Sequence, residues 1–323
     1  MKRLPKHVPI SLLSSPRAPP KQKRFFSPSP LTCASSSPIA KELQSRPPKL
    51  IPDYLNPMAS HLLATTLADL LHAPSASSPT IQSPPTVLPQ GHHLVYFPIQ
   101  TAPSKLAPDG ADPDHAPGLG FTRRMWAGGE VLFRKGWRER LLLDGRPWRC
   151  REEMGDVRVG PDKVFVDVWR RYGAGLGWDV EERRTLVFMR DGGLPAAPRR
   201  LIKFPHGASW SRTLVPTARH LFYFSALTFN AHAIHIDPLY ARSTDGHRDL
   251  LVHGPLTLAI MLDALGGHVE RIEYRNHAPL YVGEEMTVCV RRPDGGKSWD
   301  VWVEGPEGGL AVKGTAVMEC LDA

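Results

Sequence analysis

The second half of the chain carries the clearest alternation of apolar and polar positions. Four stretches there predict β-strands, at residues 268–274, 286–290, 298–303 and 310–319. Turn-forming residues separate the last three of these strands: Asp294-Gly295 lies between the second and third, and the neighbourhood of Gly305-Pro306 lies between the third and fourth. Ahead of them, an apolar segment that begins at Gly254 and ends at Leu265 predicts a buried helix. Strands that follow one another after one buried helix imply an antiparallel sheet wrapped around that helix.

The first half shows the same order of elements. Residues 57–71 have the spacing of an amphipathic helix, with Asn56 as the candidate N-cap. Strands are predicted at 130–133, at 163–169, where alternate valines share one side, and at 185–189. The sequence therefore predicts two α+β units of the same kind, although no residue-level identity between the halves is evident.

Three segments of unusual composition divide these elements. Residues 74–89 are dominated by Ser, Pro and Thr, and residues 103–120 by Pro, Gly and Asp, so both are predicted to be loops that bury little surface. Asp191-Gly192-Gly193, followed by Pro195 to Pro198, is the predicted linker between the two units.

The net charge of +8 is concentrated at the start of the chain. Seven cations lie within residues 2–24, ahead of Glu42, the first acidic residue, and without these seven the net charge falls from +8 to +1. A near-neutral body argues against a nucleic-acid partner, because nonspecific binding to phosphates depends on clustered cations. The longest apolar stretch, 250–265, is short and interrupted, so no membrane span is predicted.

Residues 1–36 are rich in Arg, Lys, Ser and Pro, lack acidic residues and contain Arg24-Phe25-Phe26-Ser27. These features predict a disordered mitochondrial transit peptide and hence a location in the mitochondrial matrix. A basic disordered tail without a targeting role is the alternative, since the abundant prolines weaken an amphipathic-helix reading.

The cysteines and histidines indicate neither a disulfide framework nor a metal site. Cys33 lies in the N-terminal segment, and the other three cysteines have no CxxC spacing. His232 and His235 are three residues apart with no third ligand nearby, which makes a metal pair improbable. We therefore expect no metal and no cofactor.

Two neighbouring segments carry the candidate chemistry. The first reads Leu227-Thr228-Phe229-Asn230-Ala231-His232-Ala233-Ile234-His235-Ile236-Asp237, and the second reads Leu251-Val252-His253-Gly254-Pro255-Leu256. Together they resemble the MaoC-like, (R)-specific hydratase/dehydratase family of double hot-dog proteins. The motif of that family reads roughly Ser-Gly-Asp-x-Asn-Pro-x-His-x-Asp, followed after a loop by His-Gly at the start of a helix.

His235, Asp237, His253 and Gly254 occupy matching positions, whereas Asn230, His232 and Ala233 stand where the family has Asp, Asn and Pro. The form Leu-Thr-Phe-Asn-x-His-x-Ile-His is more similar to two groups of proteins. These are the fungal mitochondrial 3-hydroxyacyl-thioester dehydratases type 2 and the mesaconyl-CoA hydratase-like proteins. Residues 90–97 and 123–129 resemble the N-terminal halves of those proteins, so the resemblance covers most of the chain after residue 36.

The resemblance implies an α+β double hot dog, with two antiparallel sheets that each wrap around a central helix. Residues 37–200 would form a non-catalytic N-terminal hot dog, and residues 201–323 a C-terminal, MaoC-like hot dog with the active site. The first half lacks an Asn-x-His-x-x-His segment, so one site per chain is expected. Two joined hot dogs already make the pseudo-dimer that the fold usually needs, which leaves open whether the protein forms a homodimer of double hot dogs.

The implied activity is a hydro-lyase reaction, the dehydration of (3R)-3-hydroxyacyl thioesters to trans-2-enoyl thioesters and its reversal, in mitochondrial fatty-acid synthesis. The acyl group would be carried on CoA or on acyl-carrier protein. Two alternatives stay open. One is a hydratase of a short branched or dicarboxylic acyl-CoA such as mesaconyl-CoA, and the other is a non-catalytic hot-dog protein that binds acyl thioesters.

Dehydration needs a base for the α-proton, a donor to the thioester oxygen and an acid for the departing hydroxyl. His235 occupies the family's catalytic position and suits the base. The amide of Gly254 at a helix start suits the thioester oxygen, because it lacks an intrahelical partner. Asn230 cannot transfer a proton as a carboxyl group does but can hold the hydroxyl or water, so His235 would move the proton in both steps.

The remaining motif residues are expected to contact the substrate: His232, Asp237, His253 and Pro255. The histidines and the residues at the helix start have simpler explanations than substrate binding. His232, His253 and the pair His92-His93 could be ordinary structural histidines, and Gly254-Pro255 could be only a helix N-terminus, where Pro is favoured.

Overall fold

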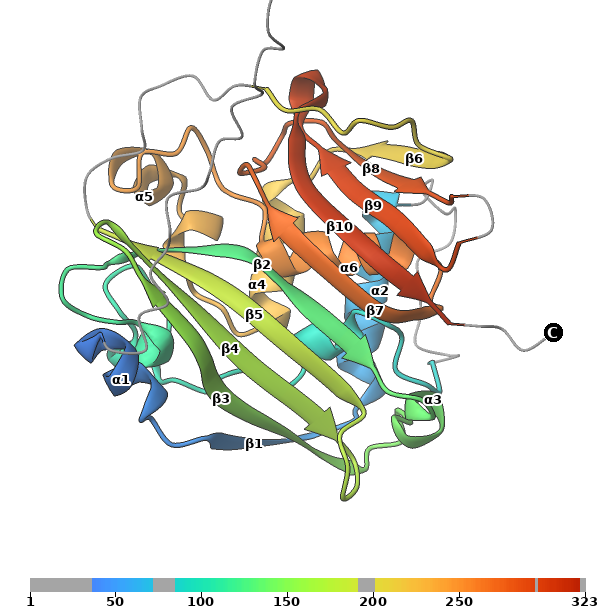
Figure 1. Cartoon of the computed structure of the whole chain (residues 1–323), viewed down its shortest axis with the longest axis horizontal. Helices are drawn as coiled ribbons and strands as arrows, with labels where there is room; N and C mark the ends of the chain where they lie inside the picture. The colour runs from blue at the N-terminus through green and yellow to red at the C-terminus, as the bar shows by residue number, and fades with distance from the viewer. Residues whose placement is uncertain (1–36, 72–84, 191–200, 294–295, 320–323) are drawn as a thin grey trace, which may run out of the picture. The chain divides into compact units, whose positions relative to one another are not determined.

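One antiparallel sheet runs through both halves of the chain (Figure 1). In the computed structural model, residues 37–71, 85–190, 201–293 and 296–319 are described. Within them the sheet has ten strands, whose spatial order is β1 (Lys49–Tyr54), β3 (Pro147–Val159), β4 (Lys163–Gly173), β5 (Val180–Met189), β2 (Arg123–Phe133), β7 (Val269–Asn276), β10 (Leu310–Met318), β9 (Ser298–Glu304), β8 (Met286–Arg291) and β6 (Trp210–Leu214).

The pairing of β2 with β7 joins the five strands of the first half to the five of the second. Gly128 and Gly129 of β2 lie opposite Arg275 and Tyr274 of β7. A Cβ at Gly128 would lie 2.4 Å from the carbonyl oxygen of Tyr274, so the strands approach too closely there for a side chain. The expectation of two separate sheets is therefore wrong in this detail, because the edges of the two predicted sheets pair into one.

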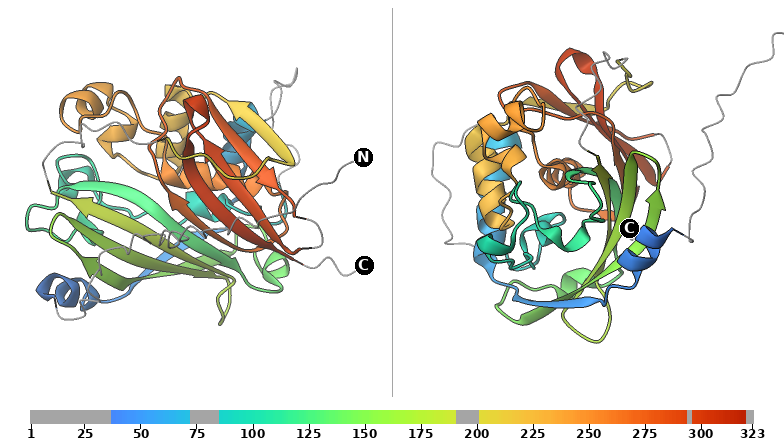
Figure 2. Two further views of the ribbon diagram at one scale, coloured as in Figure 1. Left: turned by 45° about the horizontal axis from the view of Figure 1, so that its top comes forward. Right: turned by 90° about the vertical axis from the view of Figure 1, so that its left-hand side faces the viewer.

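The buried helix of the second half is α6 (Gly254–Ala264), and Figure 2 shows it inside the curve of the sheet. Every residue from 256 to 262 is buried. The helix contacts β8 and β9 on one side and β2 and the 3₁₀ turn η1 (His92–Val95) on the other. A helix that is apolar all round belongs in a core, and α6 confirms the helix predicted at Gly254.

The amphipathic helix of the first half is α2 (Pro57–Leu71), with the bounds predicted. Asn56 caps it, since its Oδ1 accepts a hydrogen bond from the amide of Met58 at 2.9 Å. This helix packs mainly against η1 of the first half and against α4 (Ala218–Leu227) and β6 of the second half. The short η1, and not a full helix of the first half, faces α6, so the prediction of a central helix in each half is wrong for the first half.

Strands β1, β3 and β6 were not predicted. In β3 the inward positions are Trp148, Cys150 and Glu152, and the buried glutamate interrupts the apolar alternation. Glu152 lies 2.8 Å from His115 and 3.1 Å from the guanidinium of Arg170, which compensates for its burial. Residues 103–120 are mostly exposed or half-buried, as predicted for a loop, but Ala111 and His115 are buried and His115 belongs to this network.

The remaining elements are short: α1 (Pro38–Gln44), η2 (Pro103–Lys105), η3 (Pro113–His115), α3 (Trp137–Arg140), η4 (Ala233–His235), α5 (Pro238–Ser243) and η5 (Pro306–Gly308), which lies at the turn predicted there. The predicted transit peptide, the linker, the turn at Asp294-Gly295 and most of the loop at 74–89 lie outside the described residues. The division into 37–200 and 201–323 stays a prediction. In the part of the chain that the structure describes, no helix is long and apolar enough to cross a bilayer.

Candidate active site

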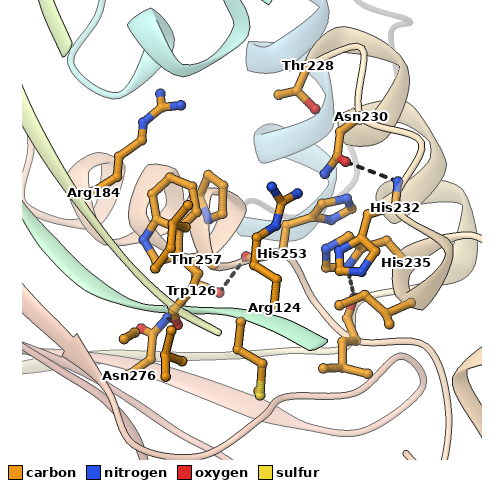
Figure 3. Close-up of a pocket in the computed structure, with 18 of the residues that line it drawn as sticks. Arg124, Trp126, Arg184, Thr228, Asn230, His232, His235, His253, Thr257 and Asn276 are labelled. Carbon is orange, nitrogen blue, oxygen red and sulfur yellow. Dashed lines mark hydrogen bonds between the residues drawn. The ribbon is translucent and has the colours of Figure 1, made fainter. Parts of the chain in front are cut away.

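A cavity of about 450 Å³ lies between the two halves of the sheet and takes residues from both. The second half contributes the loop 228–235, the entry to α6 and the residues after β7. The first half contributes the segment after η1, the start of β2, and inward side chains of β4 and β5. The cavity brings together six of the seven predicted site residues, namely Asn230, His232, His235, His253, Gly254 and Pro255. The first four are labelled in Figure 3.

The loop between α4 and η4 is fixed by local hydrogen bonds. Phe229 has a φ of 51°, in the left-handed region, and turns the chain away from α4. The amide of Asn230 then donates to the carbonyl of Ser225 at 2.8 Å, and its Oδ1 accepts from the amide of His232 at 3.1 Å. Asn is well suited to such a turn, and the Nδ2 group of Asn230 is left without a partner among the described residues.

His235 is buried and lies at the end of η4. Its Nδ1 lies 2.8 Å from the carbonyl oxygen of Leu251, which can only accept, so we assign the proton to Nδ1. Nε2 is then an acceptor on the side of the cavity, with no hydrogen bond to any described residue. Burial, followed by the neighbouring His253 and His232, holds the pKa of His235 well below its usual value, so the ring is neutral near pH 7.

His253 supports the ring of His235 from behind. The two rings stack with centroids 3.7 Å apart and planes 21° apart. Nε2 of His253 lies 2.8 Å from the hydroxyl of Ser225, and burial lowers the pKa of His253 to about 3. A fully buried, neutral histidine of this kind fits a packing role better than direct contact with a polar ligand.

The start of α6 presents a free amide beneath Trp126. Gly254 is the first helical residue and Pro255 the next, so the Gly254 amide has no intrahelical partner. A Cβ at Gly254 would lie 2.9 Å from both Cβ and Cγ of Trp126. Only glycine therefore allows the first half to pack against this helix end.

His232 is held by a residue of the first half that the sequence did not reveal. Its Nε2 lies 3.2 Å from Oδ2 of Asp109, and the Asp109 carbonyl accepts from the amide of Ala233 at 2.8 Å. Burial lowers the pKa of His232 although Asp109 opposes the shift. Burial is the largest single influence on Asp109 and opposes its ionisation, but contact with His232, the hydrogen bond from the Ala111 amide and the charge of Arg124 together outweigh burial and lower the pKa of Asp109. No signal in the sequence connects the two, which are over 120 positions apart.

Asp237 is the predicted site residue that the structure leaves outside the cavity. It is exposed at the start of α5, where its Oδ1 accepts hydrogen bonds from the amides of Leu239 and Tyr240 at 2.9 and 3.0 Å. This is an N-cap. Its match to the family motif is explained by the turn that it stabilises.

Several cavity residues were not predicted, among them Arg124, Trp126, Arg184, Thr257 and Asn276. Arg184 stacks over Trp126 at 5.3 Å and is paired with Glu182 at 2.8 Å. Among the described residues no group of three or more His, Cys, Asp or Glu is arranged to hold a metal ion. The chemistry available is that of a neutral histidine, a helix-end amide, a carboxamide and a guanidinium.

Comparison with known proteins identifies the family. The sequence profile of hydroxyacyl-thioester dehydratase type 2 matches residues 91–282, more than half of the chain. The chain belongs to the hydroxyacyl-thioester dehydratase type 2 family. The match to this family includes η1, β2, the loop 228–235 and α6, and therefore both walls of the cavity.

Two curated relatives of this dehydratase family member cover most of its length. It is 32% identical to the mesaconyl-C(4)-CoA hydratase of Chloroflexus aurantiacus, over 75% of this chain and 86% of that protein. It is 25% identical to the mitochondrial hydroxyacyl-thioester dehydratase type 2 of Schizosaccharomyces pombe, over 79% and 92%. Both relatives are named as a hydratase or dehydratase, which are hydro-lyases, so this family member is an enzyme that adds or removes water at an acyl thioester.

Solved structures support the hot-dog fold of this dehydratase. A MaoC-like dehydratase from Phytophthora capsici superimposes with a TM-score of 0.64 at 15% identity, over 86% of this chain and 98% of that one. HtdX from Mycobacterium tuberculosis gives a TM-score of 0.58 at 15% identity, over 83% and 100%. The expected α+β hot-dog class is confirmed.

Proposed function

We propose that this enzyme converts (3R)-3-hydroxyacyl thioesters to trans-2-enoyl thioesters, and the reverse, as the dehydratase of mitochondrial fatty-acid synthesis. The observation that carries the proposal is the apolar part of the cavity lining that the first half contributes: Leu94, Phe97, Phe165, Val168, Leu186, Val187 and Met189. Such a wall suits a hydrocarbon chain that enters past His235.

The proposed base is His235. Its Nε2 would take the proton from the α-carbon, and the electron pair of the broken C–H bond would form the double bond as the C–O bond breaks. The proton then passes to the leaving oxygen, which departs as water. Because Nδ1 is held by the Leu251 carbonyl, the ring cannot turn its donor side toward the substrate.

The Gly254 amide would donate to the thioester oxygen while negative charge develops there. Nδ2 of Asn230 would hold the departing hydroxyl, or the entering water in the reverse direction. Pro255 and His232 line the substrate path, and His253 supports His235. For Asp237, which caps α5, we propose that any effect on the substrate is exerted through this turn.

A mitochondrial location is supported by the basic, acid-free residues 1–36 and by two yeast relatives that are named mitochondrial, from S. pombe and Saccharomyces cerevisiae. We expect import into the matrix to remove roughly the first 25 to 40 residues. Protein recovered from mitochondria with Met1 or Lys2 still attached would contradict this.

A second candidate substrate is a short dicarboxylic or branched acyl-CoA such as mesaconyl-CoA. The relative from C. aurantiacus, at 32% identity, is named for that substrate and is more similar to this chain than the S. pombe protein at 25%. The two candidates share the reaction and the site and differ in the acyl group.

Turnover of a substrate series separates them. Purified protein would be assayed with 3-hydroxyacyl and enoyl thioesters of 4 to 16 carbons on CoA and on acyl-carrier protein, together with mesaconyl-CoA. The proposal expects kcat/KM to rise with chain length beyond four carbons. A preference for mesaconyl-CoA would support the second candidate, and no turnover of any thioester by folded protein would refute the proposed function.

A further inference from the structure

Arg124 is a cation at the cavity with little compensation from the protein. It belongs to β2 of the first half and lines the cavity. Its Nη1 donates to the carbonyl of Asp112 at 3.1 Å, the one hydrogen bond that its side chain makes to the described residues. A guanidinium has five N–H donors. Most of the donors of Arg124 are therefore free to bind something else.

Neighbouring arginines are paired in a way that Arg124 is not. Arg123 lies 3.3 Å from a carboxylate oxygen of Asp245, and Arg184 lies 2.8 Å from one of Glu182. Two carboxylates, Asp109 and Asp112, act on Arg124 through their charge, but neither forms an ion pair with it within the described ranges. Asp109 is engaged with His232, and Asp112 accepts hydrogen bonds from Thr101 and from the amide of Asp114. A cation in a partly buried cavity without a paired anion is costly, which indicates that a bound anion or a developing negative charge completes the site.

The guanidinium is directed at the reacting groups. In Figure 3 the side chain extends from β2 past His253, and its nitrogens point toward Asn230. Its charge acts on both His232 and His235. The thioester oxygen already has the Gly254 amide as donor, so the oxygen at the β-carbon, beside Asn230, is the group left with an incomplete set of donors.

We propose that Arg124 is a catalytic residue, donated by the first half, that binds the β-oxygen of the substrate together with Asn230. As the C–O bond breaks, the electron pair moves to the oxygen, and N–H donors of Arg124 stabilise the negative charge that forms. Arg124 keeps its protons. The proton that turns the leaving oxygen into water is the one that His235 removed from the α-carbon, so atoms and charges balance. This inference rests on the proposed function.

The guanidinium of Arg124 thus assists departure of the hydroxyl, as the Asp carboxyl group that stands at the position of Asn230 in the MaoC-like motif would do. A carboxylic acid lowers the barrier for hydroxide departure by giving a proton, and a guanidinium lowers it by stabilising the charge. Two other anions are candidates to bind the guanidinium of Arg124: the free carboxylate of a dicarboxylic substrate and a phosphate of CoA. The choice of substrates in the test distinguishes all three.

The test compares Arg124→Ala and Arg124→Lys with Arg190→Ala. Arg190 is a matched control, because it also donates to one loop carbonyl, that of Leu119 at 2.8 Å, and packs on Phe121 outside the cavity. Hydration would be followed with crotonyl-CoA, with S-crotonyl-N-acetylcysteamine, which has no phosphate, and with mesaconyl-CoA. Circular dichroism and thermal unfolding report whether each variant is folded.

We expect Arg124→Ala to lower kcat by about 10²-fold on all three substrates, the size of effect seen when one donor to a developing oxyanion is removed. Added guanidinium chloride at non-denaturing concentrations should restore part of the rate in this variant and none in Arg190→Ala. Arg124→Lys should keep part of the rate, which preserves the test if the alanine variant does not fold.

The inference is overturned if crotonyl-CoA is hydrated at the wild-type rate by Arg124→Ala. Loss confined to mesaconyl-CoA would identify a carboxylate subsite instead, and a higher KM for the CoA esters but not for the N-acetylcysteamine ester would identify a phosphate contact. Inactivity of the wild-type protein with every thioester would refute the proposed function itself, which keeps the two failures distinct.

Discussion

Replacing Gly254 by alanine tests whether the end of α6 is part of the active site. The added Cβ would lie 2.9 Å from Cβ and Cγ of Trp126 and 3.2 Å from its Cδ1. Trp126 cannot easily yield, because its indole nitrogen donates to the hydroxyl of Tyr274 at 2.7 Å and its carbonyl accepts from Asn276 at 2.8 Å. The clash must therefore move the helix end or the strand β2.

The size of the effect follows from this geometry. Overpacking by one methyl group in a tight contact costs about 1–3 kcal/mol of unfolding free energy. For a protein of this size, each kcal/mol lost lowers the Tm by roughly 2–4 °C. A shift of the helix end also takes the Gly254 amide away from the thioester oxygen. Loss of such a donor lowers kcat by about 10²–10³-fold.

The assay is thermal unfolding together with crotonyl-CoA hydration, with Gly207→Ala as the control. Gly207 lies in a loop, has no heavy atom within 4 Å of a built Cβ and does not have a positive φ, so alanine is tolerated there. We expect the control to retain the wild-type Tm and rate. A Gly254→Ala variant that is destabilised but turns over at the wild-type rate would remove this amide from the mechanism. Wild-type stability would refute the packing argument as well.

Three further predictions concern the histidines and Asn230. His235→Ala should lower the rate by at least ~10²-fold, as expected for loss of a general base, with circular dichroism unchanged; near-wild-type turnover would exclude it as the base. Asn230→Ala should lose much of the rate, whereas Asn230→Asp should keep measurable activity and add an ionisation to the pH–rate profile; equal turnover in all three forms would leave Asn230 only its turn-forming role. Finally, His92, His93 and His253 have pKa values lowered by burial to about 4, 4 and 3, so the folded state resists their protonation while the unfolded state takes up protons below pH 6.5. Each of these three histidines should lower the free energy of unfolding by about 2 kcal/mol when the pH falls from 7.5 to 5. A urea midpoint that is the same at pH 7.5 and pH 5 would contradict this.

Apart from β6, the sheet and the buried helix of the second half could be predicted from the sequence because their periodicities are simple. The strands β7 to β10 alternate, and α6 is a continuous apolar run that begins with Gly-Pro. In the first half, the inward faces of β3 and β4 carry Glu152 and Arg170, which lie 3.1 Å apart, and Glu152 also contacts His115 from a distant loop. A pattern that relies on pairing between distant charges cannot be recognised strand by strand, and β3 was missed for this reason.

The candidate site divides in the same way. Asn230, His232, His235, His253 and Gly254 lie in two nearby segments, so a single motif indicates them all. Asp109, Arg124 and Trp126 come from a loop and a strand of the first half that have no catalytic motif of their own. Their part in the site depends on how β2 pairs with β7, and that pairing is a tertiary contact which local sequence does not encode.

These three residues also change the role assigned to the first half. The first half, which lacks the motif, was expected to be non-catalytic. In the structure it holds His232 through Asp109, covers the Gly254 amide with Trp126 and places the guanidinium of Arg124 in the same cavity as Asn230. Gly110 makes the first of these contacts possible, since a Cβ there would lie 2.1 Å from the carbonyl oxygen of Ala231. Under the proposed function, the half that carries the histidines therefore depends on the other half for its site, and covalent linkage of the two halves keeps both sides of the proposed site together.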